Sequence, residues 1–278
     1  MAGETARVQA PSGRLLWSYF LKSTGLLHVL RRKHDSCRFA RVLLYHHVPD
    51  NGAESFDRHL RHLAENYTVL PLRDLLAALK AGSLPRRAVA ITFDDGFLSV
   101  YENAAPALKR YGFSATLFVT TDFAGIRDKG QARAFCISNF KRRDGLENMT
   151  WEQLRELSDW GFEIGSHTGT HPVLSEIRDS STLGEEILGS RKILEREIGT
   201  EVSAFSFPFG SGKDCDARVL SVVREAGYTS CFSGIRGWND RNTNPYYFFR
   251  DPIDPLWPVE VLEMFLSGGG DWWGKIPR

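Results

Sequence analysis

Short apolar segments alternate with amphipathic segments along most of the chain. Six segments rich in Val, Leu, Ile and aromatic residues have the length and composition of buried strands. They cover residues 41–48, 88–93, 114–120, 162–167, 204–210 and 228–233, and an extended segment follows at 246–253. Apolar residues recur at helical spacing in 55–67, 71–82, 99–112, 150–161, 181–199, 216–227 and from Pro258 onward.

Several of the predicted helices carry their own end signals. Pro71 stands near the start of one helix and Gly82 at its end, the usual asymmetry of helix termini. Thr150 and Gln153 have the spacing of a capping box. Strands that alternate with helices predict an α/β protein with a parallel sheet covered by helices. Six or seven such units in about 240 residues favour one (β/α) barrel over two domains.

The longest segment without a periodic pattern covers residues 122–149. Loops of this length inside a domain are usually functional or mobile, so we expect one of these roles here. The segment also holds the one strongly basic patch of the sequence, formed by Arg127, Lys129, Arg133, Lys141, Arg142 and Arg143.

The composition changes this picture little. Of 278 residues, 42% are hydrophobic and 25% are charged, as in an ordinary globular protein with a sizeable core. A formal net charge of +1 provides no global field for a polyanion, so we predict no nucleic-acid partner. The four cysteines lie far apart without a CxxC pair, which predicts free thiols in a reducing compartment.

The N-terminal region does not have the order of segments that marks a secretory signal. Residues 15–33 are apolar, but Lys22, Ser23 and Gly25 interrupt them, so they do not predict a membrane-spanning helix. Aromatic residues followed by three basic residues at 31–33 are typical of an interfacial helix. The alternative is a helix that packs on its own domain.

Polar residues gather where the predicted strands end. Asp94, Asp95 and Gly96 follow the strand at 88–93, and His167 and His171 follow the next strand but one. The other strand ends carry His46 and His47, and Pro208, Phe209 and Gly210. Because the active sites of α/β barrels lie at the carboxyl ends of the strands, we expect these side chains to converge on one rim.

One carboxylate and two imidazoles form a ligand set for a divalent metal such as zinc, with positions left open for water and substrate. The second acid of the pair would remain free to take a proton from water that the metal activates. Such a cation would also offset the repulsion between Asp94 and Asp95. Each feature alone has an ordinary structural explanation, because paired aspartates before a glycine are common in turns and helix caps. Their combination at strand ends is far more specific.

The motifs TFDDG at 92–96 and HTGTHP at 167–172 resemble those of the polysaccharide deacetylases, the NodB-homology domains of carbohydrate esterase family 4. The resemblance covers roughly residues 40–265. It implies a distorted (β/α)7 barrel that removes acetyl groups from sugars with a divalent metal, usually zinc, with cobalt or nickel as alternatives. By position, Asp94 would be the general base, and Asp95, His167 and His171 would bind the metal.

The segment FPFG at 207–210 resembles the third motif of this family. In that motif the proline and the aromatic residue, here Pro208 and Phe209, shape the acetyl pocket, and the backbone N–H of Phe209 would stabilise the oxyanion. The usual arginine two residues before the proline is replaced by Ser206. Arg250, near the end of a late strand, is a candidate for its role.

The usual C-terminal histidine of the family is also absent, since no histidine follows His171. Permuted members, similar to the exopolysaccharide deacetylases of biofilm systems, place this residue on a strand before TFDDG. The segment LLYHHV fits that arrangement. Strand alternation sends His46 and His47 to opposite faces, and the pattern of the permuted branch selects His46 as the catalytic acid. The alternative is that both histidines are structural.

The predicted function is metal-dependent hydrolysis of the N-acetyl group of an amino sugar in a polysaccharide or glycan precursor, with release of acetate. The alternatives are an O-acetyl esterase or another amide hydrolase on the same scaffold, and a glycan-binding barrel without turnover. We expect an N-terminal segment at 1–39, a catalytic domain at 40–267 and a C-terminal tail at 268–278. The location predicted is cytoplasmic, with peripheral contact to the inner face of the membrane through residues 15–33.

Overall fold

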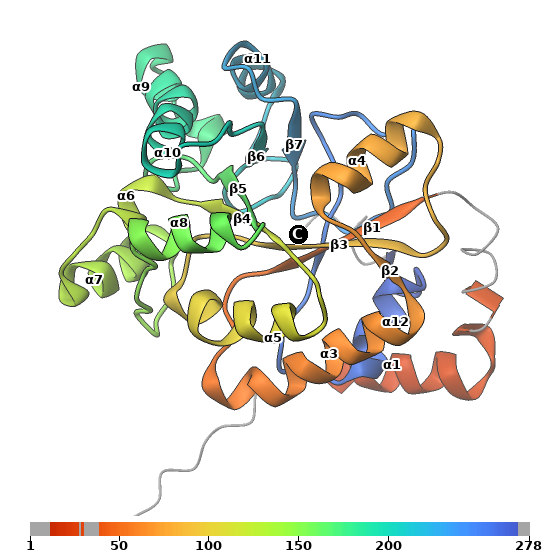
Figure 1. Cartoon of the computed structure of the whole chain (residues 1–278). Helices are drawn as coiled ribbons and strands as arrows, with labels where there is room; N and C mark the ends of the chain where they lie inside the picture. The colour runs from red at the N-terminus through yellow and green to blue at the C-terminus, as the bar shows by residue number, and fades with distance from the viewer. Residues whose placement is uncertain (1–11, 28, 31–38, 272–278) are drawn as a thin grey trace, which may run out of the picture.

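A parallel sheet occupies the centre of the protein, and helices surround it (Figure 1). The structure is a computed structural model that describes residues 12–27, 29–30 and 39–271. The strands are β1 (Ala40–Tyr45), β2 (Thr68–Val69), β3 (Ala88–Phe93), β4 (Thr116–Val119), β5 (Glu163–Ser166), β6 (Ala204–Ser206), β7 (Ser230–Phe232) and β8 (Asp251–Pro252).

The sheet has the order β7-β6-β5-β4-β3-β1-β8, with β2 paired to β3, and each ladder between these strands is parallel. The helices are α1 (Ser12–Ser23), α3 (Ala53–Asn66), α4 (Leu72–Ala81), α5 (Ala105–Arg110), α6 (Thr121–Ala124), α7 (Lys129–Asn139), α8 (Trp151–Asp159), α9 (Ser180–Gly184), α10 (Ser190–Ile198), α11 (Ala217–Glu225) and α12 (Val259–Leu266). Two π-helical turns, η2 (Val100–Ala104) and η4 (Glu185–Gly189), lead into α5 and α10. The 3₁₀ turns are η1 (Asp50–Gly52) and η3 (Leu174–Glu176).

The segment at 248–252 brings the two ends of the sheet together. On one side its Phe248 exchanges backbone hydrogen bonds with Cys231 and Ser233, at β7. On the other side Asp251 and Pro252 pair with β1. The sheet therefore curls into the distorted barrel that the sequence predicted, and the buried Arg250 lies between these two contacts.

The strand residues alternate between two apolar clusters. Val89 and Ile91 of β3 face the large cluster that the surrounding helices complete. Ala88 and Ala90 belong to a second cluster. That cluster brings Phe118 of β4 against Phe232 of β7, with 5.3 Å between the ring centroids. Two intervening strands separate β4 from β7, so these rings meet on the concave face of the curled sheet. This face leads toward the carboxyl ends of the strands.

Most predicted strands and helices match the observed ones to within a few residues, but β2 was not predicted, and the extended segment at 246–253 is a strand only at Asp251–Pro252. The segment at 122–149 is not a loop throughout, because α6 ends in it and α7 covers residues 129–139. The helix α7 buries only Ala132 and Cys136, so its apolar pattern is short. The basic patch is also partly neutralised, since Lys129 and Arg133 both form ion pairs with Glu147.

The helix α1 packs on the domain through one side. The indole N–H of Trp17 donates to the carbonyl of Gly269 at 3.0 Å, and Leu21 is buried. The basic residues at 31–33, expected to lie at a membrane surface, and Cys37 lie outside the described residues. The other three cysteines, Cys136, Cys215 and Cys231, are free and buried. Within the described part of the chain, no helix has both the length and the apolar character that crossing a bilayer requires.

Candidate active site

The paired aspartates lie on a sharp turn at the end of β3. The backbone of Asp95 is left-handed, with φ of 76°, and that of Gly96 has φ of 93°. Left-handed geometry suits glycine and costs an aspartate free energy, on the order of 1–2 kcal/mol. At this turn each of the two adjacent carboxylates reaches its own set of partners.

The two histidines lie on the loop that follows β5. The N–H of His167 continues the sheet by donating to the carbonyl of Val119 at 2.9 Å. Beyond it, Thr168 and His171 adopt left-handed backbones with φ of 71° and 65°. The Thr168 hydroxyl accepts a hydrogen bond from the N–H of His171 at 3.0 Å. This tight loop turns both imidazoles toward the end of β3.

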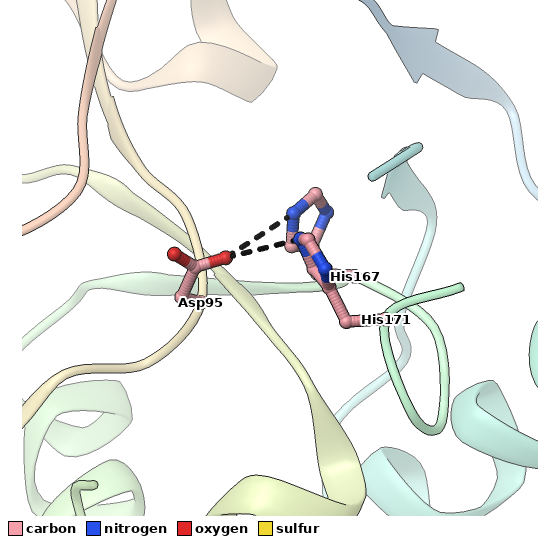
Figure 2. Close-up of side chains that lie close together, drawn as sticks. All are labelled: Asp95, His167 and His171. Atoms are coloured by element: carbon pink, nitrogen blue, oxygen red, sulfur yellow. Dashed lines mark ion pairs between the residues drawn. The ribbon is translucent and has the colours of Figure 1, made fainter. Parts of the chain in front are cut away.

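Asp95, His167 and His171 come together as a buried triad (Figure 2). Oδ1 of Asp95 lies 3.4 Å from Nε2 of His167 and 3.5 Å from Nε2 of His171. A tetrahedral zinc ion with bonds of about 2.0–2.1 Å would separate its ligand atoms by roughly 3.4 Å. The same Oδ1 atom is buried and accepts no hydrogen bond from the described residues. The geometry and the donor set therefore fit a divalent metal.

A hydrogen bond fixes the orientation of His167. Its Nδ1 lies 2.7 Å from the carbonyl oxygen of Ser206, so Nδ1 carries the hydrogen and donates. In the neutral imidazole Nε2 keeps its lone pair, which faces Asp95 and the metal position. Ligand histidines are commonly held in this way by a second partner.

The electrostatics of the triad favour a charged carboxylate. The pKa of Asp95 lies well below its ordinary value although burial raises it, because the nearby ring of His167, followed by the charges of His46 and His171, outweighs the burial. Burial lowers the pKa of His171 to about 4, against the opposing charge of Asp95. An ionised carboxylate and a neutral imidazole are the forms that bind a metal.

Asp94 lies beside the triad, with Oδ2 3.8 Å from Nε2 of His167, and is held by a buried arginine. Nη1 and Nη2 of Arg250 donate to Oδ1 and Oδ2 of Asp94 at 2.7 and 2.8 Å, in a bidentate pair. Burial alone would raise the pKa of Asp94, but the charge of Arg250, followed by that of His167, outweighs it and keeps the pKa below its ordinary value. Asp94 is therefore ionised and oriented, as a general base must be.

Ser206 completes this arrangement. Its hydroxyl donates to Oδ2 of Asp94 at 3.2 Å and accepts from Nη2 of Arg250 at 2.7 Å. The carbonyl of Ser233 accepts from Nε of Arg250 at 2.8 Å. A serine at position 206 leaves room for a guanidinium that arrives from the closing segment of the barrel. The candidate Arg250 thus lies where the sequence lacks the usual arginine.

The two histidines at the end of β1 have different surroundings. His46 is half-buried beside both aspartates, and its charge is among those that lower the pKa of Asp95. His47 instead receives a hydrogen bond at its Nε2 from Nη2 of Arg142, at 3.1 Å. Burial, followed by the charge of Arg142, lowers the pKa of His47 to about 4. The charge of His46 acts on both aspartates, whereas His47 is bound to Arg142, and the catalytic role of His46 stays a prediction.

Aromatic side chains flank the metal position. The rings of Phe140 and Phe209 lie 4.7 and 4.8 Å from that of His171. Phe209 is 47% exposed and has a left-handed backbone with φ of 62°, and Pro208 before it is buried. These residues form an apolar wall beside the triad, where the sequence placed an acetyl pocket.

Backbone strain is concentrated at this site. Six non-glycine residues of the described chain have positive φ, and four of them are Asp95, Thr168, His171 and Phe209. Strained backbones of this kind cluster where function requires a fixed geometry. The sequence pattern did not predict the part that α7 plays here. The amide of Asn139 donates to the carbonyl of Thr170 at 2.8 Å, which connects the end of α7 to the histidine loop.

Comparison with known proteins agrees with this geometry. A sequence model for polysaccharide deacetylases matches residues 81–231, more than half of the chain. YxkH of Bacillus subtilis, named as a polysaccharide deacetylase, is 24% identical over 221 residues, which cover 77% of this chain and 71% of that protein. A poly-beta-1,6-N-acetyl-D-glucosamine N-deacetylase of Staphylococcus aureus is 29% identical over 188 residues. That match covers 65% of this chain and 59% of the relative, which is less than two thirds of its length.

Solved structures share the fold. The Streptococcus pyogenes deacetylase PplD, determined in complex with acetate, superposes with a TM-score of 0.67 at 22% sequence identity. The match covers 82% of this chain and 98% of that structure. At this identity the likeness establishes the fold, a distorted barrel of parallel strands.

Proposed function

The chain belongs to the polysaccharide deacetylase family, and from this premise we propose that it is a metal-dependent hydrolase of the N-acetyl group of an amino sugar. One observation carries the proposal. A metal-ligand triad and a separately tethered carboxylate lie side by side at the ends of parallel strands. The substrate would be an N-acetylated polysaccharide or glycan precursor, and the products would be acetate and a free amine.

Each residue would have a distinct task. A divalent ion held by Asp95, His167 and His171 would polarise the acetyl carbonyl and make water more acidic. Asp94 would take the proton from the attacking water, because Arg250 keeps it ionised. The backbone N–H of Phe209 would donate to the developing oxyanion. His46 would protonate the departing amine.

The relatives favour an amide over an ester substrate. The Staphylococcus aureus relative is named for the N-deacetylation of poly-beta-1,6-N-acetyl-D-glucosamine. An O-acetyl esterase on the same scaffold would use the same residues, so the substrate distinguishes the two. A glycan-binding barrel without turnover would have no need for a buried Asp95 oxygen that faces two histidines and accepts no hydrogen bond from the described residues.

The test is acetate release from matched substrates. Purified protein loaded with zinc, cobalt or nickel is offered β-1,6-linked N-acetylglucosamine oligomers and an O-acetylated sugar. We expect release from the N-acetyl substrate and a loss of about 10²–10⁴-fold in kcat for Asp94→Asn. Preferential release from the O-acetyl sugar would support the esterase alternative. A folded, metal-loaded protein that releases acetate from neither substrate would support the binding alternative.

We further propose that α1 contacts an anionic membrane surface. Of the ten large hydrophobic side chains that the described residues expose, five lie between 16 and 29. Leu16 and Phe20 are 69% and 51% exposed, while Leu21 on the other side of the helix is buried. Residues 12–33 also contain five basic and no acidic side chains. An apolar face beside positive charge suits anionic lipid headgroups, and the inner face of the cytoplasmic membrane is the location we propose.

Vesicle sedimentation tests this contact with the full chain. We expect binding to phosphatidylglycerol vesicles, weaker binding to phosphatidylcholine vesicles, and loss of binding in the double variant Leu16→Ser/Phe20→Ser. Ile137→Ser is the matched control, because Ile137 is 51% exposed on α7. Equal sedimentation of the double variant and the wild type would refute the contact.

A further inference from the structure

Glu186 is a buried acid outside the proposed reaction. It is only 8% exposed, and it lies in the π-helical turn η4 between α9 and α10. Its neighbour Glu185, on the same turn, is exposed. A buried glutamate needs partners for its oxygens, and π-helical turns are frequent at functional sites.

Its partners all belong to the loop that carries the metal ligands. Oε2 of Glu186 accepts from the backbone N–H groups of Gly169 and Thr170, both at 2.9 Å. Oε1 accepts from the hydroxyl of Thr170 at 2.6 Å. One carboxylate thus receives three hydrogen bonds from two residues that lie between His167 and His171. Hydrogen bonds to an ionised carboxylate are among the stronger ones in proteins.

The loop needs such support because its backbone is strained. Thr168 and His171, on either side of the Glu186 contacts, have left-handed φ values of 71° and 65°. Such conformations persist only where the surroundings hold them. The contact also explains Gly169, since a Cβ atom at that position would lie 3.1 Å from Oε2 of Glu186.

We propose that Glu186 is a positioning residue for the metal centre. It holds the loop at 167–171 in the strained conformation that brings both histidine Nε2 atoms to Asp95. This inference rests on the proposed metal site and adds a part that the motifs do not include, because Glu186 lies on a separate helical turn. The expected consequence is that metal affinity depends on a side chain that does not touch the metal.

The experiment measures zinc affinity by competition with a chromophoric chelator, in parallel with circular dichroism and thermal melting of the metal-free protein. For Glu186→Ala we expect zinc affinity to fall about 10–100-fold, the usual effect of losing a residue that orients metal ligands. Glu186→Gln keeps an oxygen that can accept from the two backbone N–H groups, so we expect it to recover much of the affinity. Glu185→Ala is the matched control and should bind zinc as the wild type does.

The outcomes separate this inference from the proposed function. If Glu186→Ala is folded and binds zinc with wild-type affinity, Glu186 has only a structural role and the inference is wrong. If Glu186→Ala does not fold, the zinc affinities of Glu186→Gln and Glu186→Asp are measured instead. Glu186→Asp should then bind zinc more weakly than the wild type, because the shorter acid cannot span the three contacts, and wild-type affinity in both variants would overturn the inference. A wild-type protein that binds no divalent metal overturns the metal centre itself. Zinc binding without acetate release would contradict the proposed function alone.

Discussion

Replacing Arg250 is the most informative change to the catalytic machinery. Its guanidinium is 1% exposed and forms the bidentate pair with Asp94. In Arg250→Gln, the Asp94 carboxylate would stay buried with the Ser206 hydroxyl and the new amide as hydrogen-bond partners, and with Nε2 of His167 3.8 Å away. Removing one member of a buried ion pair costs about 3–5 kcal/mol when the other stays charged.

The lost interaction also changes the pKa of the Asp94 carboxyl group. Losing the guanidinium charge raises the pKa of Asp94, because it removes the main effect that favours the ionised carboxylate. The sign follows from the cause, since burial raises this pKa and Arg250 is the largest effect that lowers it. Because the base must be ionised, the acidic limb of the kcat/KM profile should move to higher pH.

The assay is acetate release at saturating metal from pH 4 to 10. We expect Arg250→Gln to be weakly active at neutral pH and to recover activity as the pH rises. Arg250→Lys keeps the charge but loses the planar fork, so its acidic limb should shift less. Melting curves of the metal-free variants check that each is folded. A folded Arg250→Gln enzyme whose acidic limb coincides with that of the wild type would refute the claim that Arg250 keeps Asp94 ionised.

Three further predictions concern other parts of the molecule. His46→Gln should lower kcat on an N-acetyl sugar by about 10²–10⁴-fold. It should affect the hydrolysis of 4-nitrophenyl acetate much less, because the leaving group of that ester needs no proton. Equal losses on the two substrates, or an equal effect of His47→Gln, would contradict the role of His46 as the acid. His59 is buried between the Tyr45 hydroxyl and the Trp257 carbonyl, and burial lowers its pKa to about 4. Between pH 4 and about 6.5 the unfolded state therefore binds more protons than the folded state, so the free energy of unfolding should fall by about 2 kcal/mol from pH 7 to pH 5 because of this histidine. Urea melts in the presence of a chelator should show this pH dependence, and His59→Gln should lose it. An unchanged pH dependence in His59→Gln would contradict the prediction. In Gly165→Ala the new Cβ would lie 2.6 Å from the Phe118 ring, which should lower the free energy of unfolding by about 1–3 kcal/mol. Gly184→Ala is the control and should not lower it, because no atom lies within 4 Å of its new Cβ. Equal stability of the two variants would argue against tight packing beneath the site.

The sequence predicted the barrel well because most of its strands and helices carry a local signal. The strand at 88–93 is observed with the same bounds, and the capping box of Thr150 and Gln153 is present. The triad could be anticipated because its residues directly follow parallel strands, whose carboxyl ends must meet. In these cases the information lies within a few residues of the feature.

The parts that the sequence could not supply depend on distant contacts. Arg250 could only be a candidate, because its approach to Asp94, 156 residues away, follows from the closure of the barrel. Glu186 was not foreseen, since a glutamate in an amphipathic helical pattern ordinarily faces solvent. The helix α7 was missed because it buries only Ala132 and Cys136. Each of these depends on tertiary packing, which periodicity does not encode.

The most direct test of the central claim is a metal titration of acetate release. Protein stripped by a chelator should be folded and inactive on an N-acetylated glucosamine oligomer, and one equivalent of zinc, cobalt or nickel should restore activity. Asp95→Asn should bind the metal weakly and fail to recover at that dose, because it loses the charged oxygen that both histidines face. Full activity in the stripped protein, or stoichiometric recovery in Asp95→Asn, would contradict a metal centre built from Asp95, His167 and His171.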